Sequence, residues 1–219
     1  MPQILSASAL SLNDVYRLLG LEQQVASSFT ELLSLQPLTE GEHQELLQIR
    51  NDFYGYLAEG KVSEGLVKFL TLAPLMRLAG FYQFPIRLTM EESIADIAIR
   101  DEDKIITGRM DILAVSNAQA ERADGRFWIL VIEAKNSEAD VFAGLPQLLT
   151  YAFKSLEPQL STWGLVTNGL RYLFVYLKQG TPPTYQLVLP ELNLLEPERT
   201  IQLLKVLKAI CNENTALPV

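Results

Sequence analysis

Three charged residues interrupt apolar stretches of the chain at positions where they could hold a metal ion. Glu133 and Lys135 stand two positions apart at the end of the apolar stretch FWILVIEAK, so in a strand both side chains leave the same face. A buried strand has no structural use for two charges there. Asp111 interrupts the preceding apolar stretch, and antiparallel pairing of the two strands would bring it beside them. Because carboxylates on neighbouring strands bind hard cations, the sequence predicts a Mg²⁺ or Mn²⁺ site.

Such a site has a defined chemistry. A divalent ion held by Asp111 and Glu133 acts as a Lewis acid on a phosphate oxygen and lowers the pKa of a bound water. Lys135 can orient that water or offset charge on the phosphate. Gln147 and Tyr151 lie one helical turn apart in the next predicted helix, so both can face the site. The free N–H groups at the start of that helix would point at a phosphate.

Composition nearly excludes several other catalytic chemistries. Cys211 is the only cysteine and His43 the only histidine among 219 residues. Cys/His zinc sites, disulfides and catalytic pairs that need a second histidine are therefore disfavoured. The net charge of -8 argues against a surface that binds nucleic acid broadly through its phosphates, although the acidic excess lies mainly in the N-terminal half. We expect an oxygen-ligated metal rather than a softer one.

Helical spacing of apolar residues dominates residues 11–80. Thr39 and Glu42 form the pattern of a capping box, which predicts a helix beginning there. Ser63 is the expected N-cap of the following helix, SEGLVKFLTLAPLMRLAGF, and Pro74 is expected to bend it.

Beyond residue 80 the pattern changes to short strands. A helix is expected over residues 138–156 and a last helix over residues 198–210. The expected strands are YQFPIRL, SIADIAI, IITGRMDILAV and FWILVIEAK before the first of these helices, and STWGLVTN, LRYLFVYL and TYQLVLP after it. This order of elements predicts an α/β fold with a mixed sheet between helices.

The domain organisation expected from these patterns is simple. Residues 1–60 should form an N-terminal helical extension packed on the core, and residues 61–219 one compact domain. The acidic helices over residues 11–58 could cover one side of the sheet, form a dimer interface or contact a protein partner. No apolar run is long enough to span a bilayer and no signal-peptide pattern opens the chain, so we expect a cytoplasmic protein.

Three motifs in order, GRMD, EAK and QLLTY, resemble the PD-(D/E)xK restriction-endonuclease-like superfamily, especially its RecB-type nucleases. The context is also similar to the N-terminal nuclease domain of type I restriction enzyme R subunits. That family has a glutamate-bearing helix ahead of the sheet, matched by Glu64, and a TNG turn into an aromatic strand, matched by Thr167, Asn168 and Gly169. The resemblance covers about residues 62–178. The proline before the acidic residue is missing.

The resemblance implies a restriction-endonuclease-like mixed sheet flanked by helices, and a Mg²⁺-dependent or Mn²⁺-dependent nuclease acting on DNA. The positions that it assigns to catalysis are Asp111, Glu133, Lys135, Glu64 and Gln147. The implied metal ligands are Asp111, Glu133 and the carbonyl oxygen of Ala134. Gly108 matches the glycine before the acidic residue, and Tyr151 matches a supporting tyrosine.

Each motif also has a structural reading. The charged residues could form a salt-bridge cluster or belong to a decayed nuclease, and the chain could then be a binding module for nucleic acid or protein. Glu64 is explained equally by the dipole of its helix. Gln147 could be a solvated helix residue and Tyr151 a core aromatic. The sequence leaves open whether DNA or RNA is the substrate, and whether cleavage is internal or from ends.

Overall fold

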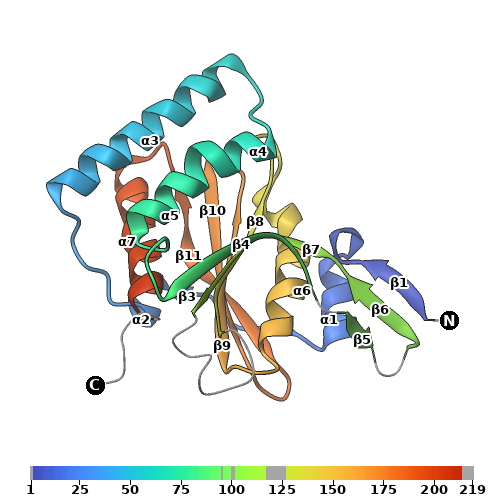
Figure 1. The fold of residues 1–219 in the computed structure, drawn as a ribbon. Coiled ribbons are helices and arrows are strands. Elements are labelled where there is room, and N and C mark those ends of the chain that lie inside the picture. Colours follow the sequence, from blue (N-terminus) through green and yellow to red (C-terminus); the bar gives the residue numbers. More distant parts are fainter. Residues whose placement is uncertain (1, 95, 100–101, 117–126, 214–219) are drawn as a thin grey trace.

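The computed structural model describes residues 2–94, 96–99, 102–116 and 127–213, and it has an α/β fold built around a large mixed sheet (Figure 1). The sheet order is β2 (Glu22–Gln23), β11 (Thr184–Asn193), β10 (Arg171–Lys178), β9 (Ser161–Thr167), β8 (Phe127–Ala134), β7 (Arg109–Ser116) and β4 (Ile86–Ser93), with β3 (Ser27–Ser28) also on β11. Strands β8 and β9 are parallel, as are β2 and β3 with β11, and the other neighbours are antiparallel. The predicted mixed sheet is confirmed.

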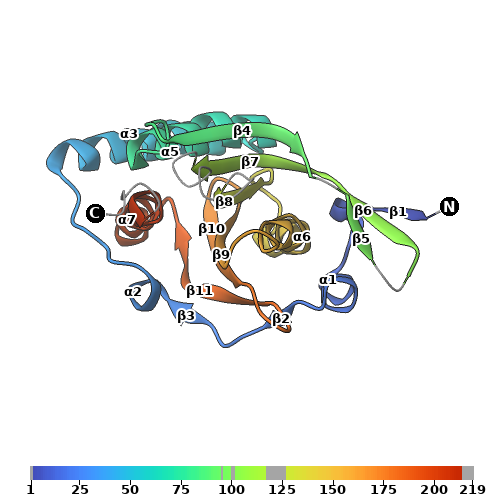
Figure 2. The same ribbon diagram turned by 60° about the horizontal axis from the view of Figure 1, so that its bottom comes forward.

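Helices cover both faces of this sheet, so its central strands are buried on both sides (Figure 2). One face packs against α2 (Phe29–Leu32), α3 (Glu40–Glu59), α5 (Ala73–Ala79) and α7 (Pro197–Glu213), and the other against α1 (Leu12–Leu19) and α6 (Leu145–Ser155). Along β7, Ile112 and Ala114 enter the first core whereas Leu113 and Val115 enter the second. This alternation is the two-residue period of a strand.

A small second sheet joins the N-terminus to the middle of the chain. Strand β1 (Gln3–Ser6) pairs in parallel with β6 (Lys104–Thr107), which pairs antiparallel with β5 (Ile97–Ile99). The short helix η1 (Ala7–Ala9) follows β1, and its Ala7 is buried in the core shared by α1 and α6. The predicted strand IITGRMDILAV is therefore wrong as a single element: it divides at Gly108 into β6 and β7, which belong to different sheets.

The helical pattern predicted for residues 11–80 is wrong between Glu22 and Ser28. There the chain is extended, and β2 and β3 pair with β11. Both strands are two residues long, so their hydrogen bonds to the edge of the sheet stabilise them rather than any periodic burial. Residues 1–60 thus contribute β1, β2 and β3 as well as helices α1, α2 and α3.

The helix starts follow the predicted caps. The Thr39 hydroxyl accepts from Glu42 N at 3.3 Å while the Glu42 carboxylate accepts from Thr39 N at 2.7 Å, which is the reciprocal capping box. The Ser63 hydroxyl accepts from Leu66 N at 3.4 Å. The helix that it begins is divided into α4 (Glu64–Val67), a π-helical turn η2 (Lys68–Leu72) and α5, with Pro74 in the first turn of α5.

The register of β7 against β8 positions the candidate site. The two strands are antiparallel and Ile112 pairs with Ile132. Asp111 directly precedes Ile112 and Glu133 directly follows Ile132. The two acidic residues therefore lie across from one another, at the start of β7 and the end of β8. The predicted connection between the strands, residues 117–126, lies outside the described residues.

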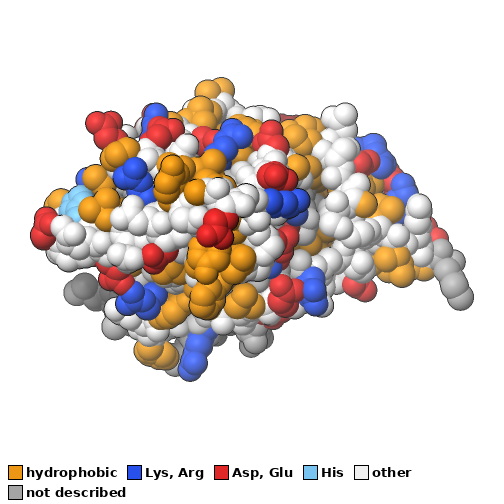
Figure 3. Space-filling model, turned by 90° about the horizontal axis from the view of Figure 1, so that it is seen from above, with side chains coloured by type: hydrophobic (Ala, Val, Ile, Leu, Met, Phe, Trp, Pro, Cys, Tyr) orange, Lys and Arg blue, Asp and Glu red, His pale blue; other side chains and the backbone are white. Residues whose placement is uncertain are grey.

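The outer face of α3 and α4 is mixed in character. Figure 3 shows hydrophobic side chains interspersed with acidic and basic ones on this face. The exposed large hydrophobic residues of α3, α4 and η2 are Leu47, Tyr54, Tyr56, Leu66 and Phe69. In the part of the chain that the structure describes, no helix combines the length and the hydropathy needed to cross a membrane.

Candidate functional site

Asp111 is held from two sides. Its Oδ2 accepts a hydrogen bond of 2.7 Å from the backbone N–H of Ala134, the residue between Glu133 and Lys135. Its Oδ1 accepts a hydrogen bond of 2.6 Å from Lys68 Nζ. The Asp111 side chain is only 13% exposed, so these two charge-assisted contacts determine its orientation.

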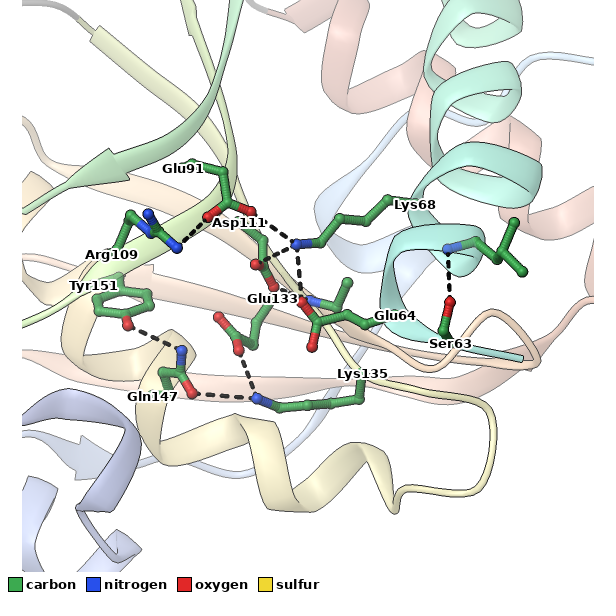
Figure 4. A network of polar contacts seen from close by, with 12 residues as sticks. Ser63, Glu64, Lys68, Glu91, Arg109, Asp111, Glu133, Lys135, Gln147 and Tyr151 are labelled. Carbon is green, nitrogen blue, oxygen red and sulfur yellow. Dashed lines mark hydrogen bonds and ion pairs between the residues drawn. The ribbon is translucent and has the colours of Figure 1, made fainter. Parts of the chain in front are cut away.

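Lys68 lies at the centre of three carboxylates that come from three different elements (Figure 4). Besides Asp111 on β7, its Nζ contacts Glu64 Oε1 on α4 at 2.9 Å and Glu91 Oε1 on β4 at 3.3 Å. Burial would lower the pKa of Lys68, but hydrogen bonds to Asp111 and Glu64 outweigh it and raise that pKa above its ordinary value. Lys68 is therefore an ammonium at every pH near neutrality.

Glu133 is the most deeply buried acid of the site, with a side chain 2% exposed. Its Oε1 accepts from Lys135 Nζ at 2.6 Å. Its Oε2 is buried and has no hydrogen-bond partner among the described residues. Burial, and after it the negative charge of Asp111, raise the pKa of Glu133 to about 7 although the contact with Lys135 opposes the rise. One oxygen of this carboxylate is thus left without a cation or a donor by the part of the chain that the structure describes.

A chain of hydrogen bonds leads from Glu133 to helix α6. Lys135 Nζ also donates to Gln147 Oε1 at 3.2 Å, and Gln147 Nε2 donates to the Tyr151 hydroxyl at 2.9 Å. Gln147 and Tyr151 stand one turn apart on α6, as expected. Burial raises the pKa of Tyr151, with a further contribution from the charge of Glu133. Tyr151 is therefore a neutral donor and acceptor that fixes the amide of Gln147.

Two glycines leave the space in which these side chains lie. A Cβ atom on Gly108 would stand 2.7 Å from the ring of Tyr151 and 2.8 Å from its hydroxyl. A Cβ atom on Gly144, just before α6, would stand 3.1 Å from Lys135 Cε and 3.3 Å from Glu133 Cγ. Contacts below 3.0 Å require a shift of the neighbour, so Gly108 is required by the packing of Tyr151. Gly144 was not singled out by the sequence.

The exposed rim of the site is formed by Glu91 and Arg109. Glu91 lies between Met90 and Glu92, which pair with residues on either side of Asp111, and its φ is 56°. A non-glycine residue in this left-handed region carries strain, and such strain is concentrated at functional sites. Arg109 Nη2 contacts Glu91 Oε2 at 2.7 Å, and the Arg109 side chain is largely exposed. Neither residue was predicted from the sequence.

The segment after Lys135 is anchored by the hairpin between β9 and β10. Lys135 N donates to Thr167 O at 2.8 Å. Asn168 Nδ2 donates to the carbonyl oxygens of Ser137 and Ala139, at 3.4 and 2.9 Å, while its Oδ1 accepts from the backbone N–H groups of Leu170 and Arg171. The Asn-Gly turn is therefore more than a hairpin turn, because its buried asparagine holds the backbone that follows the catalytic candidates.

The structure brings together all the side chains that the sequence analysis placed in the site. Asp111, Glu133, Lys135 and Gln147 are linked by the contacts above, and Glu64 joins them through Lys68. Ala134 touches Asp111 through its backbone N–H. Lys68 was missed, although a glutamate and a lysine four residues apart in an otherwise apolar helix are a readable signal.

Within the described ranges, no three or more His, Cys, Asp and Glu side chains form a group that could hold a metal ion. The physical reason lies in the ammonium groups. Lys68 is bound to Asp111 and Glu64, and Lys135 is bound to Glu133, so lysines stand where carboxylates would otherwise converge.

No protein-family model matches the chain, and no curated protein matches it either.

Proposed function

We propose that this protein is a metal-dependent nuclease of the PD-(D/E)xK type with a restriction-endonuclease-like fold, and that it hydrolyses phosphodiester bonds of DNA. One observation carries the proposal: Glu133 Oε2 is a buried carboxylate oxygen without a hydrogen-bond partner in the described part of the chain, on a residue next in register to Asp111. A salt-bridge cluster that served only stability would have no reason to leave this oxygen unsatisfied.

The donor set fits a hard divalent cation. Within the described ranges no group donates to Glu133 Oε2, and the oxygens of Asp111 each accept one hydrogen bond, which leaves a further lone pair on each. Carboxylate oxygens are the ligands that Mg²⁺ and Mn²⁺ prefer. A cation beside Glu133 would also oppose the burial and the charge of Asp111 that raise its pKa, because it would balance the negative charges of both carboxylates.

The residues of the chain have separable roles in this proposal. A divalent ion bound by Asp111 and Glu133 would supply Lewis-acid polarisation of a phosphodiester and acidify a water molecule. Lys135 has three N–H donors, of which two are directed at Glu133 and Gln147, so the third is available to a water or a phosphate oxygen. Tyr151 keeps the Gln147 amide oriented so that its oxygen faces Lys135.

DNA is the proposed substrate because the motifs resemble those of DNA nucleases. The chain is acidic overall, so binding of DNA phosphates requires positive charge near the site. Lys135 and Arg109 are cations at the site that are open to solvent, at 23% and 63% side-chain exposure. Both are placed to neutralise backbone phosphates rather than to read bases, which favours cleavage without sequence specificity.

A panel of labelled substrates tests the proposal. Single-stranded and double-stranded DNA, linear and circular, and RNA would be incubated with Mg²⁺, Mn²⁺ or EDTA. Cleavage by the wild-type protein that requires metal and that Asp111→Asn abolishes supports the nuclease, and circular substrates separate internal from terminal cleavage. If no substrate is cut, the catalytic proposal fails. The alternative, a nuclease-like module that binds nucleic acid or protein, then replaces it.

A further inference from the structure

We propose that the ammonium group of Lys68 is a built-in cation of the site, which competes with the divalent ion for Asp111 and so weakens metal binding. This inference rests on the proposed function for the identity of the metal site. It concerns a residue that none of the motifs contains.

The surroundings of Lys68 are those of a bound cation. Its Nζ lies within 2.6 to 3.3 Å of one carboxylate oxygen each from Asp111, Glu64 and Glu91. These acids come from β7, α4 and β4, so they converge only in the folded chain. The Lys68 side chain is 10% exposed, and in Figure 4 it extends from its helix into the space between the three carboxylates. A buried ammonium needs such oxygens, and here it has three.

The backbone at Lys68 also departs from regular structure. Lys68 is the first residue of the π-helical turn η2, between α4 and α5. A π-helical turn inserts one extra residue and rotates the following helix face, and such turns are frequent at functional sites. On the opposite side of the ammonium, Glu91 has a positive φ. Lys68 and Glu91, whose side chains are in contact, therefore each lie at a local distortion of the backbone.

A count of charges shows what remains for a metal ion. The cluster contains four carboxylates, Glu64, Glu91, Asp111 and Glu133, and it contains three cations, Lys68, Arg109 and Lys135. With all groups ionised its net charge is therefore -1. The uncompensated part lies at Glu133 Oε2. A divalent ion that binds there must share Asp111 with an ammonium held 2.6 Å from Oδ1, and like charges repel.

The consequence is a site whose metal affinity is set by Lys68. As the ion approaches Asp111, Lys68 retains Glu64 and Glu91 as partners, so the ammonium stays paired after it yields Asp111. Removing the charge of Lys68 should leave Asp111 and Glu64 free to join Glu133 around the ion. Metal binding should then become tighter.

Calorimetric titration with Mn²⁺, without nucleic acid, tests this directly. The variants are Lys68→Met and Lys68→Gln, which remove the charge, and Lys68→Arg, which keeps it. Lys154→Met is the matched control, because Lys154 pairs with Glu157 outside the site. We expect both neutral variants to bind Mn²⁺ at least tenfold more tightly than the wild type, which is about 1.4 kcal/mol. Lys68→Arg and Lys154→Met should stay close to the wild type. Equal or weaker binding by the neutral variants overturns the inference.

Thermal unfolding of the same proteins shows whether each variant is folded. The neutral variants should melt at lower temperature than the wild type without metal, because three carboxylates lose their partner, and Mn²⁺ should raise their melting temperature more than that of the wild type. An equal or smaller rise overturns the inference.

The two proposals fail separately. If the wild type cleaves DNA but Lys68→Met binds Mn²⁺ with unchanged affinity, only the proposed role of Lys68 is contradicted. If Lys68→Met binds Mn²⁺ more tightly but neither the wild type nor any variant cleaves DNA, only the nuclease proposal is contradicted.

Discussion

Asp111 and Glu133 lie across from one another, next to the paired residues Ile112 and Ile132, yet they are bound by different ammonium groups. Asp111 is held by Lys68 from the helical side, and Glu133 by Lys135 from its own strand. Asp111 therefore raises the cost of ionising Glu133 without sharing a cation with it. This explains why burial and the charge of Asp111 together leave the pKa of Glu133 raised despite its lysine.

The stability of the protein should fall as the pH rises through the titration of Glu133. The folded pKa is about 7, against an ordinary value of 4.5, so between these values the folded state binds the additional proton. Stability is then highest below about pH 4.5 for this group and is lost up to about pH 7, by roughly 3 kcal/mol at most. Glu133→Gln should lack this loss. Urea unfolding of both proteins without metal, over this pH range, measures it. If the free energies of unfolding of the two proteins change with pH in the same way, Glu133 does not have a raised pKa.

Metal binding should release a proton in slightly acidic solution. Near pH 6 Glu133 is mostly protonated in the folded protein, and a metal ligand must be ionised. Titration with Mn²⁺ in two buffers of different ionisation enthalpy should therefore show close to one proton released per ion, falling towards none above about pH 8. The absence of proton release at the lower pH would show that Glu133 does not bind the ion.

Gly108→Ala should destabilise the protein and disturb the site. The added Cβ would stand under 3.0 Å from the Tyr151 ring, and the ring is buried, so the packing must shift at a cost of about 1–3 kcal/mol. Gly55→Ala is the matched control, because a Cβ there meets nothing within 4 Å and Gly55 lies inside helix α3. That control should gain about 0.5–1 kcal/mol. Thermal melts that rank the two variants in the opposite order would contradict the packing argument.

Asn168→Ala should loosen the segment after Lys135. The substitution removes two donated hydrogen bonds to residues 137 and 139 and two accepted bonds inside the turn. We expect a loss of about 2–4 kcal/mol of stability, because four partly buried backbone groups lose their partner at once. Hydrogen exchange should become faster for the amides of residues 135–139. If these amides exchange at the same rate in Asn168→Ala as in the wild type, Asn168 stabilises only the hairpin.

The convergence of Asp111, Glu133 and Lys135 could be predicted because it depends on short-range rules. Side chains alternate along a strand, and consecutive strands tend to pair, so two interrupted apolar stretches are enough to bring the charges to one edge. The same holds for Gln147 and Tyr151, which one helical turn separates.

The role of Lys68 could not be predicted in this way. Its contact with Asp111 joins residues 43 positions apart. Lys68 also lies in a π-helical turn, which the spacing of apolar residues does not predict. The close packing of Gly108 against Tyr151 likewise joins residues that are distant in sequence. Strands β1, β2 and β3 have two to four residues each, too few to show a period of two.

One comparison tests the nuclease proposal most directly: the rate of DNA cleavage with Mg²⁺ by the wild type, Lys135→Met and Lys154→Met, each also with EDTA. Lys154 lies on α6 and pairs with Glu157, so its variant controls for the loss of a lysine outside the site. The account predicts metal-dependent cleavage by the wild type and by Lys154→Met, and a loss of at least about a hundredfold in Lys135→Met. Cleavage that persists in Lys135→Met, or that continues in EDTA, would contradict it.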